Sequence, residues 1–275
     1  MGTENEGKKV NIYTKYLILL VLFGIGSIVA AIFIIQAHIE YGIDKAVYAE
    51  ITEQVKIDDG KSDAIKNDES IEPLVKFKEL YSINPDIIGW LYACGGSIEG
   101  PVTTSVDDVY YLTHRFDGAE SGAGTFFIDR LCDRPFENSL TVIYGHNRKD
   151  GSMFHPLLSY KDYDYYAKNP HLMVQTENAM LKYEVVSAFY ADSQEIFDDK
   201  GRSEITRINS ADNESECEEF VRMLSKKGLY NADLTESQPT AKDRYLMLVT
   251  CEYSGDDNRM VVIGRLSDAC TVFEE

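Results

Sequence analysis

Positively charged side chains are scarce in this sequence. Its 275 residues include 27 Lys and Arg against 46 Asp and Glu, which gives a formal net charge of -19 at pH 7. Binding a phosphate backbone requires clustered Lys and Arg, so this balance argues against a nucleic-acid partner. It also disfavours the anionic surface of a membrane as a direct partner. The charge instead indicates a solvated, acidic extracellular surface.

Cysteines are also few, and they are too scattered for a disulfide scaffold. There is no C-x-x-C pair, so the usual signatures of a zinc site and of a thioredoxin-type site are missing, and we expect neither a metal nor another cofactor. Because the count of five is odd, at least one thiol stays free and is a candidate nucleophile. The sequence leaves open whether the others form disulfides. The cysteines are Cys94, Cys132, Cys217, Cys251 and Cys270.

Glycine and proline are not in excess, and no repeat of solenoid length is visible. Apolar residues make up 44% of the chain and charged residues 27%, which is an ordinary globular composition. A chain of 275 residues is long enough for one sizeable core with an appendage, and too short for two comfortable domains.

One long segment, Leu17–Ala37, carries no charge and is almost entirely apolar. About 20 helical residues span a hydrocarbon core of about 30 Å, so this segment is long enough to cross a membrane. The apolar stretch of a signal peptide is shorter, at about 7–15 residues. We therefore favour an uncleaved anchor, with cleavage near Ala30 or Ala37 as the alternative. A buried core helix is disfavoured because the segment is apolar on all sides.

The charges beside this segment predict its orientation. Lys8, Lys9 and Lys15 precede it, so the positive-inside rule puts the N-terminus in the cytoplasm and the rest of the chain outside the cell, as a single-pass membrane protein. The predicted organisation is a cytoplasmic N-terminus (1–16), a transmembrane anchor (17–37), an extracellular stalk (38–70) and a catalytic domain (71–275).

Two helices are predicted in the exported part. Apolar residues recur at near-helical spacing over Ile71–Tyr81, and Asn84-Pro85 ends that helix because the residue before a proline avoids the helical region. A second helix is predicted near Ser210–Lys227, with Gly228 as its stop signal.

The remaining pattern is rich in β-strands. Short runs of Val, Ile, Tyr, Phe and Thr alternate with turn residues, and seven or eight strands with few helices favour a closed barrel or a sandwich. Periodicity alone does not choose between these two folds. The predicted strands are Ile87–Tyr92, Thr125–Ile128, Leu140–Tyr144, His171–Gln175, Leu181–Tyr190, Tyr245–Thr250 and Met260–Leu266.

The strand Tyr245–Thr250 delivers Cys251 to its end, and a short polar loop leads to Arg259 and a second apolar strand. If the two strands form a hairpin, the thiol and the guanidinium lie near the same end of the sheet. A planar, permanently charged guanidinium there could bind a substrate backbone or stabilise an oxyanion. The alternatives are a buried structural thiol at Cys251 and, at Arg259, a surface charge that offsets neighbouring acidic residues.

A nucleophilic cysteine needs a base or a cationic partner to form its thiolate. His146 directly follows an apolar strand and a glycine, which is where a rigid scaffold would present a functional imidazole. His114 and His155 lie in loop or helix contexts, and His171 begins a strand. Sequence spacing alone does not establish that any of these histidines lies close to Cys251.

Several collinear blocks resemble the class B sortases of Gram-positive bacteria. The blocks are NPDIIGWLYACGGSIEGPV (84–102), DDVYYLTHRFDG (107–118), GTFFIDRLCD (124–133), VIYGHNRKDGSMFHPLLSYKD (142–162) and LVTCEY with NRMVVIGRL (248–253 and 258–266). Behind an N-terminal anchor, this order is similar to that family over about Pro85–Leu266. One difference is Met247, at a position where the family has threonine. A methionine on a buried strand changes packing only.

The resemblance implies a closed eight-stranded β-barrel with an N-terminal helix and an inserted helix before the cysteine strand, behind the transmembrane helix. It assigns the nucleophile to Cys251, the general acid and base to His146, and substrate or oxyanion stabilisation to Arg259. Thr250 matches the threonine before the family's cysteine and is a candidate substrate-binding residue. His114 lies in a shared block but has no catalytic counterpart, so we interpret it as structural.

The implied reaction is transpeptidation. The enzyme cleaves a C-terminal sorting signal of secreted surface proteins after threonine, forms a thioester, and transfers the protein to a peptidoglycan amine. Class B sortases often take Asn-Pro-x-Thr signals, and relatives accept Pro-Pro-x-Thr-Gly. The alternatives are a housekeeping or pilin-polymerising sortase, and a non-catalytic membrane-tethered surface module. An L,D-transpeptidase fits poorly, because its Ser-x-Gly-Cys motif is absent from residues 248–253.

Overall fold

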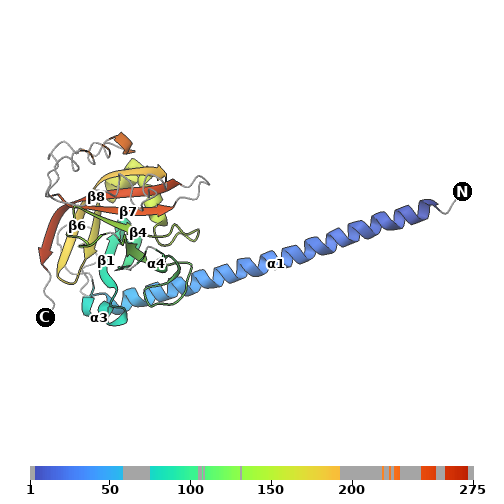
Figure 1. Cartoon of the computed structure of the whole chain (residues 1–275), viewed down its shortest axis with the longest axis horizontal. Coiled ribbons are helices and arrows are strands. Elements are labelled where there is room, and N and C mark those ends of the chain that lie inside the picture. Colours follow the sequence, from blue (N-terminus) through green and yellow to red (C-terminus); the bar gives the residue numbers. More distant parts are fainter. Residues whose placement is uncertain are drawn as a thin grey trace. The chain divides into compact units, whose positions relative to one another are not determined.

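A computed structural model of the chain describes residues 4–57, 75–104, 107, 109–130, 132–192, 219, 223, 226–229, 243–251 and 258–271 (Figure 1). The chain divides into two compact units, Met1–Ala46 and Val47–Glu275. The first unit is helical and the second contains the β-sheet.

The first unit is part of one long helix, α1 (Glu4–Val55), which includes the predicted span Leu17–Ala37. Large apolar side chains of the first unit, such as Phe23 at 76%, are exposed, although a soluble protein rarely leaves so large an apolar surface uncovered. Within the described residues, α1 is the helix that is long and apolar enough to cross a membrane. It fits either a membrane anchor or a signal sequence.

The last turns of α1 belong to the second unit. Ile51 and Val55 are buried there in one cluster with Val75 and Leu80. The described part of the segment 38–70, predicted as a stalk, therefore includes residues that are buried in the second unit.

The predicted helix Ile71–Tyr81 is wrong at Val75 and Lys76, and its residues 71–74 lie outside the described part of the chain. Helix α3 runs over Phe77–Ile83, and Val75 instead forms a β-bridge with Lys56. The buried side chain of Gln175 holds both backbone groups of Val75, accepting from its N–H at 2.9 Å and donating to its carbonyl at 2.7 Å. These tertiary bonds take the place of a helical turn. The helix ends before the Asn84-Pro85 pair, as predicted.

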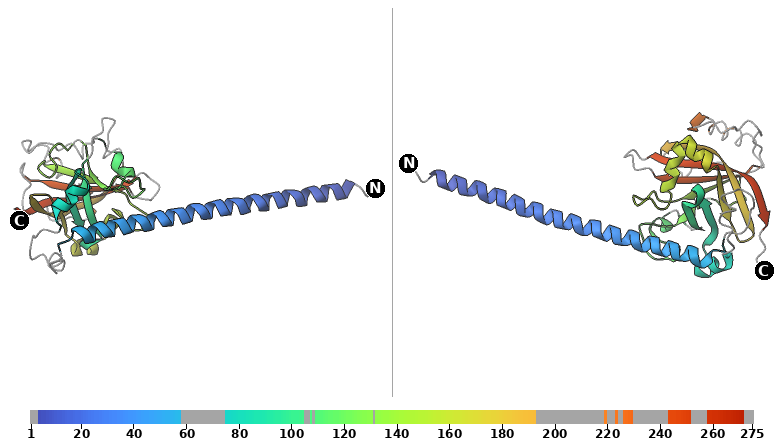
Figure 2. Two further views of the ribbon diagram at one scale, coloured as in Figure 1. Left: turned by 90° about the horizontal axis from the view of Figure 1, so that it is seen from below. Right: turned by 180° about the vertical axis from the view of Figure 1, so that it is seen from behind.

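Eight strands form a closed barrel in the order β1-β2-β3-β4-β7-β8-β6-β5, which confirms the expected fold. Figures 1 and 2 show these strands gathered in the second unit. The β2–β3 and β4–β7 pairs are parallel and the other pairs are antiparallel. The strands are β1 (Ile87–Ala93), β2 (Ile98–Thr103), β3 (Phe126–Ile128), β4 (Leu140–Tyr144), β5 (His171–Gln175), β6 (Ala179–Asp192), β7 (Tyr245–Cys251) and β8 (Asn258–Thr271). The short helices between them are η1 (Cys94–Gly96), α4 (Tyr110–Thr113), η2 (His155–Lys161) and α5 (Tyr163–Lys168).

Strand β2 is missing from the sequence prediction because it contains Gly100 and Pro101, both depleted in strands. It pairs with β1 along its whole length, whereas β3 pairs only with Val102 and Thr103. At Pro101, β2 therefore has a neighbouring strand on one side only, and a proline, which lacks an N–H, is tolerated at such an edge position.

The sheet is apolar on both faces at β7. Leu246 and Leu248 belong to one buried cluster, whereas Met247 and Val249 belong to another, so alternate side chains of β7 pack on opposite faces. Met247 is fully buried, which agrees with a packing role for this residue. The predicted helix Ser210–Lys227 lies largely outside the described residues; the four described there, Glu219, Met223, Lys226 and Lys227, are helical.

Candidate functional site

The hairpin predicted from the sequence is present. Strands β7 and β8 pair antiparallel, and Cys251 is directly opposite Arg259. Directly opposed residues of an antiparallel pair have their Cβ atoms about 4.5–5.5 Å apart on one face of the sheet. The register therefore brings these two positions together at the end of β7.

His146 reaches the same end of the sheet from β4. Strands β4 and β7 run parallel with Tyr144 opposite Val249, and the Gly145 N–H donates to the Val249 carbonyl at 3.2 Å. Neighbouring strands lie about 4.8 Å apart. His146 and Cys251 each follow this pair by two residues, so their backbones leave the sheet side by side.

The imidazole of His146 is half-buried and has a defined partner. Its Nε2 lies 2.8 Å from the carbonyl oxygen of Leu112, at the end of α4. A carbonyl only accepts hydrogen bonds, so Nε2 carries the hydrogen and donates it. The other ring nitrogen, Nδ1, is left as the position that gains or loses a proton.

Helix α4 is held by a partly buried polar network around Tyr111. The Tyr111 hydroxyl donates to Asp86 Oδ2 at 2.8 Å and accepts from Asn84 Nδ2 at 2.9 Å. Asn84 also donates to the Phe116 carbonyl at 2.8 Å. Burial is the main reason why the pKa of Tyr111 rises to about 12, so this hydroxyl stays protonated and keeps its donor role.

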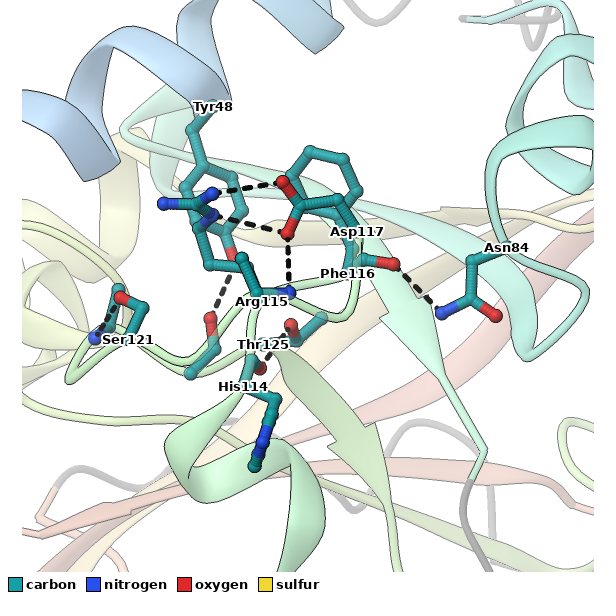
Figure 3. Close-up of polar contacts among 11 residues, drawn as sticks. Tyr48, Asn84, His114, Arg115, Phe116, Asp117, Ser121 and Thr125 are labelled. Carbon is teal, nitrogen blue, oxygen red and sulfur yellow. Dashed lines mark hydrogen bonds and ion pairs between the residues drawn. The ribbon is translucent and has the colours of Figure 1, made fainter.

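Figure 3 shows the loop that follows α4 and the contacts that hold it. The Tyr48 hydroxyl, from the end of α1, donates to the Gly124 carbonyl at 2.6 Å. Arg115 forms an ion pair with Asp117, with 2.9 Å between Nη2 and Oδ2. Thr125 Oγ1 donates to the His114 carbonyl at 3.0 Å. These bonds connect the start of the loop to the residue just before β3, and connect the end of the loop to α1.

Two other histidines have local partners. The ring of His114 stacks on Tyr110 at a centroid distance of 4.0 Å, and its Nδ1 lies 2.9 Å from the Tyr110 carbonyl. His155 Nδ1 lies 2.7 Å from Asn147 Oδ1. These contacts agree with a structural interpretation of His114.

Thr250, the candidate substrate-binding residue, is only 1% exposed and pairs with Met260. Among the described residues, Cys94, Cys132 and Cys270 are not joined in disulfides. Cys94 is buried, and burial raises the pKa of its thiol to about 12, so it is a poor nucleophile. Among the described residues there is no group of three or more His, Cys, Asp or Glu side chains that could hold a metal ion.

Comparison with known families decides the identity. The family model described as the sortase domain matches residues 109–267, which includes β3 to β7 and most of β8. The chain belongs to the sortase family. Sortases are cysteine transpeptidases, and this chain is therefore one of these enzymes.

Within the family the similarity is to sortase B. The chain is 29% identical to sortase B of Listeria monocytogenes over 231 residues, covering 82% of this chain and 89% of that protein. It is 28% identical to sortase B of Staphylococcus aureus over 235 residues, covering 85% of this chain and 88% of that protein. The crystal structure of Clostridium perfringens sortase B matches with a TM-score of 0.62 and 27% identity, over 70% of this chain and all of that one.

The residues around α4 could not be found by motif reasoning. No sequence pattern points to Leu112, because the group that contacts His146 is its main-chain carbonyl, which every residue has. Tyr111, Asn84 and Asp86 lie within the blocks that resemble sortases, but nothing in the sequence links them. Their role follows from contacts across 25 to 34 positions of the chain.

Proposed function

We propose that this sortase is a membrane-anchored transpeptidase of the B type that works outside the cell with Cys251 as its nucleophile. It cleaves a C-terminal sorting signal of secreted proteins after threonine and transfers each protein to a peptidoglycan amine. The main support is the register of three strands. The β4–β7 and β7–β8 pairings bring the backbones of His146, Cys251 and Arg259 to one end of the sheet.

In the first half-reaction the Cys251 thiolate attacks the carbonyl carbon of the threonine. The C–N bond breaks, the acyl group stays on sulfur as a thioester, and the His146 imidazolium gives its proton to the leaving amine. In the second half-reaction an amine of the peptidoglycan attacks the thioester. His146 removes a proton from this amine as the new C–N bond forms, and the C–S bond breaks to restore the thiolate.

The proposed role of Arg259 is to bind the substrate backbone and to stabilise the tetrahedral oxyanion. Its guanidinium is permanently charged and offers several N–H donors in a fixed plane, which suits a charge that develops on one oxygen. A backbone N–H near Cys251 could share this role. The pairing of Arg259 directly opposite Cys251 supports this role.

Turnover should be slow. The reactive form needs a thiolate and an imidazolium at the same time, although a thiol normally holds its proton up to a higher pH than an imidazole does.

The proposed location rests on α1. The helix carries an uncharged apolar stretch, and the lysines that precede this stretch favour a cytoplasmic N-terminus. In this arrangement the catalytic unit meets secreted proteins and the cell wall on the outer side of the membrane.

The test is an assay of the full chain in detergent with a panel of fluorogenic sorting peptides, including Asn-Pro-x-Thr and Pro-Pro-x-Thr-Gly types. We expect cleavage after threonine, and mass spectrometry should find an acyl adduct on Cys251. A Cys251→Ala protein that still cleaved a peptide would overturn the proposed mechanism. Cleavage restricted to the peptides of another sortase class would overturn the assignment to type B.

A further inference from the structure

The hydrogen bond from His146 to Leu112 determines which ring nitrogen can exchange a proton. Because the 2.8 Å bond joins Nε2 to a carbonyl oxygen, Nε2 carries its hydrogen both in the neutral ring and in the cation. It is the one hydrogen bond of this ring within the described residues. Proton transfer to and from a substrate amine is then left to Nδ1.

The acceptor of this bond is a backbone carbonyl near the C-terminal end of a helix. The last carbonyls of a helix have no partner inside the helix, and Leu112 is near the end of the single turn of α4. Its own N–H donates to the Val109 carbonyl at 3.1 Å, which fixes the peptide plane on the other side of the residue. The carbonyl oxygen of Leu112 is thus directed at His146 by local helical geometry.

The buried Tyr111 side chain holds this turn in position. Its ring is 2% exposed, and its hydroxyl makes two hydrogen bonds, one to Asp86 and one from Asn84. Leu112 is the next residue, so a shift of Tyr111 would move the carbonyl that contacts His146.

The loop that returns after α4 holds the turn from the other side. The Thr125 N–H donates to the Tyr111 carbonyl at 2.8 Å. Gly124 has a φ of +60°, and a Cβ at this position would lie 2.9 Å from the Leu112 oxygen and 2.5 Å from the Tyr111 oxygen. Tyr48 in turn binds the Gly124 carbonyl (Figure 3). The backbone approaches so closely here that the Leu112 carbonyl has little room to turn away.

We propose that the Leu112 carbonyl is a positioning group for His146 and that the Tyr111 hydroxyl is the side-chain group that sets its place. The carbonyl holds His146 in the Nε2–H tautomer, so Nδ1–H delivers the proton to the leaving amine and Nδ1 later accepts the proton of the incoming amine. This inference rests on the proposed role of His146 as the general acid and base.

The direct test is the tautomer of His146 in the native enzyme. The ring nitrogens of the ¹⁵N-labelled full chain in detergent are observed by NMR at a pH where the imidazole is neutral, and the His146→Gln spectrum assigns the signals. We expect the Nε2–H tautomer. A predominant Nδ1–H tautomer would overturn the inference, and this result does not depend on any activity measurement.

The second test compares Tyr111→Phe with a matched control. Tyr110→Phe makes the same chemical change on the same helical turn, but the Tyr110 side chain is 40% exposed and its hydroxyl has no hydrogen-bond partner in the described part of the chain. We expect Tyr111→Phe to lower kcat/KM about five- to tenfold and to give a mixed tautomer signal, with Tyr110→Phe close to wild type. Both variants are compared at temperatures where thermal unfolding shows them to be folded.

The outcomes separate this inference from the proposed function. If Tyr111→Phe lowers the melting temperature but matches Tyr110→Phe in tautomer and in kcat/KM, Tyr111 has a merely structural role and the inference fails. If His146→Gln is as active as the wild type, the proposed function fails, whatever the tautomer.

Discussion

Replacing Gly124 with alanine should destabilise the catalytic unit strongly, for two separate reasons. The residue has a φ of +60°, which costs an L-amino acid about 1–2 kcal/mol. In addition, the new methyl group would lie 2.5 Å from the Tyr111 oxygen and 2.9 Å from the Leu112 oxygen. Both atoms belong to the backbone, so they cannot move aside by a change of rotamer.

The magnitude is the sum of these two effects. Forcing an extra methyl group into a filled site costs about 1–3 kcal/mol, which with the backbone strain gives about 2–5 kcal/mol in the free energy of unfolding. For a unit of this size each kcal/mol lowers the melting temperature by about 2–4 °C, so we expect a loss of about 4–20 °C. We also expect kcat/KM to fall by more than about tenfold, because the displaced oxygen of Leu112 is the partner of His146.

Gly151→Ala is the matched control. Gly151 has a φ of +84°, also in the left-handed region, but a Cβ there would meet no atom within 4 Å. This variant should lose only the strain energy, about 1–2 kcal/mol. Thermal unfolding by circular dichroism and the sorting-peptide assay give both quantities for the two variants. Equal losses in Gly124→Ala and Gly151→Ala would refute the close backbone contact around Leu112.

Three further predictions concern single groups. Arg259→Lys should lower kcat/KM by about a hundredfold because an ammonium lacks the planar donor fork, and near-normal activity would reduce Arg259 to a surface charge. Iodoacetamide should modify Cys251 in the native enzyme and leave Cys94 unmodified until the protein unfolds, because burial raises the pKa of the Cys94 thiol to about 12. Equal labelling of the two cysteines in peptide mass spectrometry would contradict this. Burial alone would raise the pKa of Asp117, but hydrogen bonds, chiefly from Arg115, hold it below its usual value. A carboxyl group whose pKa is lower in the folded protein than in the unfolded chain stabilises the fold at any pH above its unfolded pKa, and this contribution is lost as the pH falls through its folded pKa. The difference in unfolding free energy between wild type and Asp117→Asn should therefore shrink below about pH 3.8. A difference that stays constant with pH in denaturant unfolding would contradict this.

Much of the secondary structure could be predicted from local patterns. The strands Leu140–Tyr144 and His171–Gln175 have the predicted bounds, since each is a short apolar run between turn residues. The errors arose where tertiary contacts override local preference. Strand β2 forms in spite of Gly100 and Pro101, and Val75 forms a β-bridge with Lys56, just after α1, where the sequence predicted a helix.

The choice between a barrel and a sandwich needed more than periodicity. Alternating apolar residues show that a strand has a buried face, but not which strand lies beside it. The parallel β4–β7 pair joins segments about a hundred positions apart, and closure of the sheet depends on it. The resemblance to sortases supplied this choice, and the structure confirms it.

By itself, the sequence determined that the chain has one long apolar helix, a β-rich unit after it and a set of motifs typical of sortases. These properties depend on the order and chemistry of neighbouring residues. Only the tertiary structure decided that Cys251 is opposite Arg259, that His146 leaves the sheet beside them, and that the Leu112 carbonyl holds the imidazole. Strand register is set by hydrogen bonds and packing between distant segments, and a backbone carbonyl is identical in every residue, so neither can be read from the residue types.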